Sequence, residues 1–139
     1  MKAADGHIIR KLVIVNVSSL GEIIQIDERL AGHINEIRAI GVNIVPASDL
    51  ISVNKQCGEL SLSINNHREH FFHISPGYTS ELPSAHTETL PTNKEINGNS
   101  RLTGYWVDSR FMLDSEQQFV PYQVKILLEC HIKPETINE

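Results

Sequence analysis

The sequence predicts an all-β protein in which one β-sandwich domain of about eight strands occupies residues 1–139. Apolar and polar residues alternate with a period of two in segment after segment, whereas helical periodicity never lasts longer than about two turns. Clusters of Gly, Pro, Asn and Ser separate these segments, as turns do between short strands. With 40% apolar and 21% charged residues, the chain has the composition of an ordinary globular domain.

Seven segments carry the strand pattern, and they are residues 12–17, 23–26, 33–45, 60–64, 71–75, 102–107 and 120–132. The last segment is the most regular, because its apolar residues occupy every second position from Val120 to Ile132. We expect so long and apolar a strand at the centre of its sheet, with Val124, Ile126 and Leu128 in the core. Short strands without helices predict a β-sandwich or a small barrel, and more specifically a jelly roll.

Segment 33–45 does not follow the simple alternation. Ile34 and Ile37 lie on opposite faces of a regular strand, so one straight strand cannot bury both. We therefore expect a bulge or bend near Ile40–Gly41, where the glycine permits an irregular backbone. A helix over residues 28–40 is the alternative, since several apolar residues there also have helical spacing.

A long polar loop is expected over residues 76–100, which hold three of the six prolines and many Ser, Thr and Asn residues. Loops of about 25 residues in compact domains usually carry the function or contact a partner. Such a loop cannot bury enough apolar surface by itself to offset the entropy of ordering it. We therefore expect its apolar residues to dock onto a partner, and these residues are Tyr78, Leu82, Leu90 and Ile96.

Charge and cysteine usage restrict the possible partners and location. The 17 acidic and 12 basic residues give a net charge of −5 and form no runs, so no nucleic-acid partner is expected. The apolar run from Leu12 to Val17 is too short to span a membrane, and no small-residue cleavage site follows it. A cytoplasmic location is therefore expected. Cys57 and Cys130 lack CxxC spacing, and we expect them to be buried free thiols.

Three of the seven histidines lie in the segment NNHREHFFHISPG, residues 65–77. A metal site needs ligands that converge on one point. On a strand, His67 and His73 would lie about 20 Å apart, and His70 would point to the opposite face. We therefore expect no metal and no cofactor here, and interpret Asn65–Asn66–His67 as a turn with the histidines along a polar edge.

No catalytic motif is present, since the sequence lacks a Gly-x-Ser-x-Gly elbow, a phosphate-binding glycine loop and a His-Glu-x-x-His pair. The chain is therefore not expected to be an enzyme. Tyr105 and Trp106 are adjacent, so one should face the core and the other should face outward. An exposed aromatic side chain there would stack on a sugar or fill a partner's pocket, so both are candidate contact residues.

The chain resembles the single jelly-roll structural proteins of virus particles, in particular penton and minor capsid proteins of tailless icosahedral phages. The likeness lies in its long apolar strands such as VPYQVKILLECHIK, its long polar loop between strands and its termini without processing signals. The resemblance implies a non-enzymatic capsid, penton or minor capsid subunit in a virion, with copies of itself or a major capsid protein as partners. The alternatives are a carbohydrate- or ligand-binding β-sandwich module and a metal-dependent jelly-roll enzyme.

Overall fold

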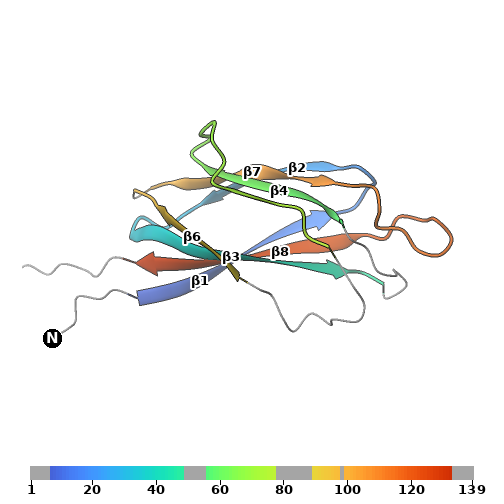
Figure 1. Cartoon of the computed structure of the whole chain (residues 1–139), viewed down its shortest axis with the longest axis horizontal. Helices are drawn as coiled ribbons and strands as arrows, with labels where there is room; N and C mark the ends of the chain where they lie inside the picture. Colours follow the sequence, from blue (N-terminus) through green and yellow to red (C-terminus); the bar gives the residue numbers. More distant parts are fainter. Residues whose placement is uncertain (1–6, 49–55, 78–88, 98, 133–139) are drawn as a thin grey trace, which may run out of the picture.

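The computed structural model describes residues 7–48, 56–77, 89–97 and 99–132 (Figure 1). These residues contain eight strands, the turns and loops that connect them, and no helix. The strands are β1 (His7–Val17), β2 (Ile23–Arg29), β3 (Ile34–Pro46), β4 (Gly58–Ile64), β5 (Phe72–Ile74), β6 (Thr89–Glu95), β7 (Arg101–Asp108) and β8 (Tyr122–Ile132). Within these residues there is accordingly no helix of the length and apolarity that crossing a membrane requires.

The strands form two antiparallel sheets that pack face to face, with the orders β1-β8-β3-β6 and β2-β7-β4-β5 (Figure 1). The pairing is nested, because β4 pairs with β5, β3 with β6, β2 with β7, and β1 with β8. The chain is thus one long hairpin whose successive pairs alternate between the two sheets. This is the strand order of a jelly roll, so the predicted fold class is confirmed.

The C-terminal strand lies where its apolar pattern predicts, between β1 and β3. It pairs with β1 over an unbroken register from His7 opposite Ile132 to Val17 opposite Tyr122. Val124, Ile126 and Leu128 are fully buried on its inner face, which confirms the expectation for the core. The facing sheet contributes its own apolar side chains to the same core, among them Leu60, Leu62, Leu102 and Trp106.

Segment 34–46 is a strand, so the alternative of a helix over residues 28–40 is wrong. The irregularity that we expected near Ile40–Gly41 occurs earlier, as two register shifts, one between Ile34 and Glu36 and one between Ile37 and Ala39. Ile34, Ile37 and Ile40 are all buried although they lie three residues apart. Since side chains in a regular strand alternate, each interval needs one extra residue, and the two bulges supply it.

The polar segment 76–100 is not one continuous loop, because residues 89–95 form β6 and pair with β3. Its composition suits an edge strand, where Pro91 loses no interior hydrogen bond and the Thr92 hydroxyl donates to the Ile37 carbonyl at 2.7 Å. Leu90 lies opposite Ile40 and is 37% exposed, whereas Ile96 packs against the core of its own chain.

The other two residues expected to contact a partner from this segment, Tyr78 and Leu82, lie outside the described residues.

Truncation of Ile126 to alanine should lower the free energy of unfolding by about 2–5 kcal/mol, because it opens a cavity in a fully buried part of the core. Urea denaturation of the variant and the wild type measures this difference. Lys125→Ala, on the outer face of the same strand, should change stability by less than about 0.5 kcal/mol. A small loss for Ile126→Ala would contradict the central position of β8.

Candidate functional site

A buried polar cluster joins the two sheets at the end of the sandwich where β7 ends and β8 begins. The Tyr122 hydroxyl donates to the Asp108 carboxylate, accepts a hydrogen bond from Trp106 Nε1 at 3.0 Å, and lies 3.3 Å from the Cys57 carbonyl oxygen. The Trp106 and Tyr122 rings also meet edge to face, with their centroids 6.2 Å apart. Because Trp106 belongs to β7 and Tyr122 to β8, these contacts cross from one sheet to the other.

Asp108 extends the cluster to two surface segments. Its Oδ2 atom accepts hydrogen bonds from the main-chain N–H of Gly21 at 2.8 Å and of Arg110 at 3.0 Å. Gly21 lies in the β1–β2 turn with a φ of +72°, and a Cβ there would come within 2.7 Å of the Arg110 guanidinium. The left-handed backbone therefore favours glycine at this position, while the Arg110 side chain could shift to relieve the contact. The carboxylate thus fixes the turn, the β7–β8 loop and β8 together.

Burial controls the ionisation of this cluster. Desolvation, helped by the negative charge of Asp108, raises the pKa of the Cys57 thiol to about 12, and burial likewise raises the pKa of Tyr122. A protonated thiol is a poor nucleophile and a poor metal ligand. No buried side-chain nitrogen or oxygen in the described segments lacks a hydrogen-bond partner. The hydrogen bonds of this cluster connect the two sheets and satisfy its buried polar groups.

The predicted turn at Asn65–Asn66–His67 is present and begins the loop between β4 and β5. Asn65 and Asn66 have φ angles of 53° and 58°, and the His67 N–H donates to the Ile64 carbonyl at 2.9 Å. Two successive residues in the left-handed region are typical of a type I′ turn, which asparagine tolerates well. The turn sends the chain back over the outer face of β4 and β7.

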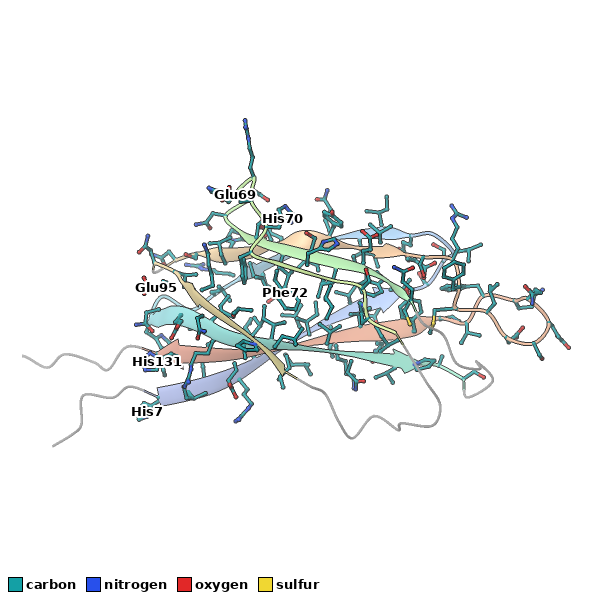
Figure 2. The ribbon with its side chains drawn as sticks, in the orientation of Figure 1. His7, Glu69, His70, Phe72, Glu95 and His131 are labelled. Carbon is teal, nitrogen blue, oxygen red and sulfur yellow. The ribbon has the colours of Figure 1, made fainter. Side chains whose placement is uncertain are left out.

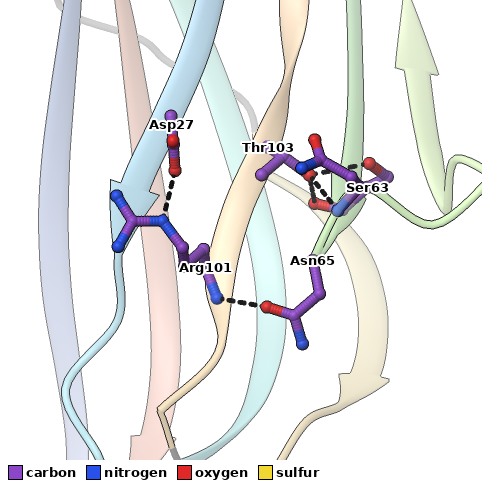
Figure 3. Close-up of polar contacts among 6 residues, drawn as sticks. Asp27, Ser63, Asn65, Arg101 and Thr103 are labelled. Atoms are coloured by element: carbon purple, nitrogen blue, oxygen red, sulfur yellow. Dashed lines mark hydrogen bonds and ion pairs between the residues drawn. The ribbon is translucent and has the colours of Figure 1, made fainter.

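Hydrogen bonds hold this loop against the sheet (Figure 3). The Arg101 N–H donates to Asn65 Oδ1 at 2.8 Å, the Asn66 N–H donates to Thr103 Oγ1 at 2.9 Å, and the Arg101 side chain reaches Asp27 at 2.6 Å. The hydroxyls of Ser63 and Thr103 lie 2.9 Å apart beneath the loop. Ser63 and Thr103 belong to the outer face, yet each is only 2% exposed, because the loop covers them.

The three histidines of this region have separate partners. His70 Nδ1 lies 2.6 Å from the Ser61 hydroxyl, His67 accepts from the Glu69 N–H, and His73 is 3.8 Å from the Glu59 carboxylate. In the described part of the chain, no three His, Cys, Asp or Glu side chains lie close enough together to hold a metal ion. Ser61 is 3% exposed, so the hydroxyl that faces His70 is largely shielded from solvent.

Two clefts flank the loop and share His67 and His70 in their walls. The larger, of about 630 Å³, lies between the loop and the residues Lys94–Asn97 and Ser100. Figure 2 shows His70 and Glu69 on the projecting loop and Glu95 on the sheet below. The smaller, of about 310 Å³, lies over the outer face of β2 and β7. Its walls include Gln25, Asp27, Asn66 and Tyr105.

Tyr105 and Trp106 point to opposite faces of β7. Tyr105 is half-buried on the outer face, where its ring centroid lies 5.9 Å from that of His70. Trp106 is fully buried between the sheets. The prediction that Trp106 could contact a partner is therefore wrong, because its side chain presents no surface.

Large apolar side chains are exposed at places that the sequence reasoning missed. One group is on the outer face of β1, with Leu12 50% and Ile14 45% exposed. Another is at the end that Asp108 fixes, with Leu20 43%, Ile23 68% and Phe111 55% exposed. The sequence does contain a signal for the first group, because the segment IIRKLVIV has apolar residues at both even and odd positions. A strand with one face in water needs only one such set.

Comparison with protein-family models, curated proteins and solved structures finds no match to this chain.

Stability should fall as the pH rises above about 9, the ordinary pKa of a thiol. Burial raises the pKa of Cys57 to about 12 and that of Cys130 to about 11, so the folded chain keeps two protons that the unfolded chain releases. Their contribution is fully present below pH 9 and is lost as the pH approaches 11 to 12. Urea denaturation at several alkaline pH values measures the decline.

A variant with Cys57→Ala and Cys130→Ala should show a shallower decline than the wild type, although its stability at neutral pH is lower. The comparison cancels the titration of lysines and exposed tyrosines, which both proteins share. Equal slopes in the two proteins would show that the thiols are accessible to solvent in the folded state.

Proposed function

We propose that the chain is a non-enzymatic assembly subunit of a virus or phage particle, such as a capsid, penton or minor capsid protein. It acts through contacts with copies of itself or with a major capsid protein, and its location is the virion. The jelly-roll strand order supports this proposal, because that architecture is common in viral capsid domains, although it also occurs in lectins and cupins.

The observation that carries the proposal is the exposure of Leu20, Ile23 and Phe111 on neighbouring segments at one end of the sandwich. Several large apolar side chains exposed in one region favour a contact site there. The two segments that bear them are connected, because Ile23 pairs with Val107 and the Gly21 N–H binds Asp108. A surface that is already rigid loses little entropy on binding, which favours its use as an interface.

The buried chemistry agrees with a role without catalysis. The Cys57 thiol is held in its protonated form, and Asp108 binds three donors of its own chain. These groups stabilise the end of the sandwich on which the exposed apolar side chains stand. They supply rigidity to an interface.

Mass photometry of the purified chain, alone and mixed with purified shell protein, tests this function. We expect the wild type to form or join larger assemblies, and Ile23→Asp to reduce incorporation at least about tenfold by placing a charge in the contact. Gln25→Asp, on the same face two residues along β2, adds the same charge without removing apolar surface and should have little effect. A wild-type chain that stays monomeric at high concentration and joins no shell protein would contradict the proposal.

A carbohydrate- or ligand-binding role is the second candidate, and the smaller cleft favours it. There the Tyr105 ring stands beside the amides of Gln25 and Asn66 and the carboxylate of Asp27. An aromatic face with amide and carboxylate groups suits a sugar ring, which has both apolar and hydroxyl surfaces.

A glycan array separates the two functions. Binding of a defined glycan that Tyr105→Ala abolishes and His73→Ala retains would support this second candidate, because His73 lies outside the cleft. A wild-type chain that binds no glycan would remove it.

A further inference from the structure

The sandwich has four edge strands, and three of them carry features that discourage pairing with another chain. β6 contains Pro91 and a residue of positive φ, Asn93; β5 has three residues; and β2 ends in the charged run Asp27–Glu28–Arg29. Proline, short length and charge are the usual protections of exposed sheet edges. The fourth edge strand, β1, differs from the other three in length and in regularity.

β1 is 11 residues long, contains no proline, and keeps one continuous register with β8 along its whole length. Among the described residues it pairs with β8 alone, so its other edge presents a row of unpaired main-chain donors and acceptors. Leu12 and Ile14 stand exposed beside that edge. A long edge strand of regular register with exposed apolar side chains is a template for strand addition.

The two positive charges of β1 are neutralised within the chain. Arg10 lies 3.2 Å from Glu129 on β8, and Lys11 lies 3.4 Å from Glu28 on β2. β1 itself contains no acidic residue. An acidic partner is therefore not needed to balance the charge of β1. Two β1 strands can approach each other without a large electrostatic repulsion.

β1 is self-complementary in an antiparallel arrangement. The register that pairs all 11 residues places His7 opposite Val17 of the second copy, and its two-fold axis passes through Leu12, the middle residue. In that register Arg10 faces Ile14 and Lys11 faces Val13, so no like charges are directly opposed. Directly opposed residues also have the same parity, so both inner faces stay on the core side.

The outer face then gains a continuous apolar row. Leu12 lies opposite Leu127 of β8 within one copy. Across the two-fold axis, the order Leu127, Leu12, Leu12, Leu127 would run over four adjacent strands. Cross-strand apolar pairs of this kind stabilise a sheet.

We infer that two copies of the chain pair through β1, antiparallel and centred on Leu12, to join their β1-β8-β3-β6 sheets into one eight-stranded sheet. The role of this contact, which is to link subunits, rests on the proposed function. The geometry of the contact is tested separately. It uses a different surface from Leu20, Ile23 and Phe111, so a subunit can engage both contacts at once.

Cysteine cross-linking tests the register in the full chain. Leu12→Cys should form an intermolecular disulfide under mild oxidation, because opposed residues in an antiparallel pair have Cβ atoms about 5 Å apart. Asn16→Cys, exposed on the same face of the same strand, is the control, since its two copies would lie about 27 Å apart. The native thiols of Cys57 and Cys130 are buried and do not interfere. Equal cross-linking of both variants, or of neither, would overturn the register.

A charge swap tests the two-fold axis by sedimentation equilibrium. Leu12→Lys and Leu12→Glu should each weaken dimerisation at least about tenfold, because each puts two like charges face to face. An equimolar mixture of the two variants should recover the dimer. Leu12 is exposed, so both variants should fold, and circular dichroism checks that they do. A wild-type monomer, or dimers unaffected by either variant, would overturn the inference.

Incorporation into shell assemblies distinguishes this inference from the proposed function. If the cross-link and the charge swap behave as expected but the chain joins no shell protein, the β1 contact stands and the proposed function fails. If Leu12→Lys joins shell assemblies as well as the wild type does and no cross-link forms, the β1 contact fails and the proposed function stands.

Discussion

The buried carboxylate of Asp108 is the interaction on which one end of the sandwich depends. Burying a carboxylate costs several kcal/mol unless hydrogen bonds replace the lost water. Asp108 recovers this cost through the Tyr122 hydroxyl and the N–H groups of Gly21 and Arg110. These donors come from the β1–β2 turn, the β7–β8 loop and the start of β8. One carboxylate therefore connects both sheets with two surface segments at this end.

The outer faces of the two sheets differ in how much of them the chain itself covers. The sheet β2-β7-β4-β5 is covered by the loop of its own chain, which buries Ser61, Ser63 and Thr103. The sheet β1-β8-β3-β6 leaves Leu12 and Ile14 half in water along one margin. The loop thus covers three polar residues on the outer face of one sheet, while two apolar side chains at the β1 edge of the other sheet stay exposed. Exposed apolar side chains beside an unpaired edge favour a contact with another chain there.

Sequence patterns predict the parts of this fold that local alternation determines. β8 follows directly from its unbroken period of two. The sequence predicts a loop where β6 lies, because its polar residues, Pro91 and Asn93 give no strand signal. Pairing with β3 makes this segment a strand. For β3 the sequence predicts one irregularity near Ile40–Gly41, whereas the structure has two bulges earlier in the strand. Apolar residues show which side chains are buried but not where an extra residue is inserted.

The candidate sites were harder to predict than the fold. Asp108 carries no sequence signal, since a single acid after a strand is typical of an ordinary turn. The opposite orientation of Tyr105 and Trp106 was predictable from strand geometry, whereas which of the two is buried depends on the twist and packing of the whole sandwich. The exposure of Leu20 and Phe111 likewise depends on how loops from two sheets meet. These orientations and exposures depend on contacts between distant parts of the chain, so the local pattern of a single sequence does not predict them.

The nested pairing also governs how the chain is made. β1 finds its neighbour only when β8 has been synthesised, since contacts such as Arg10 with Glu129 join residues 119 positions apart. Contacts at such separations slow folding, because a long stretch of chain must be closed before they form. During translation the apolar first strand therefore waits without a partner on either side while the rest of the chain emerges. The edge strand with the least protection in the finished sandwich is thus also one that lacks its sheet neighbour while β2 to β7 are being made, and unpaired apolar strands of this kind are prone to aggregate.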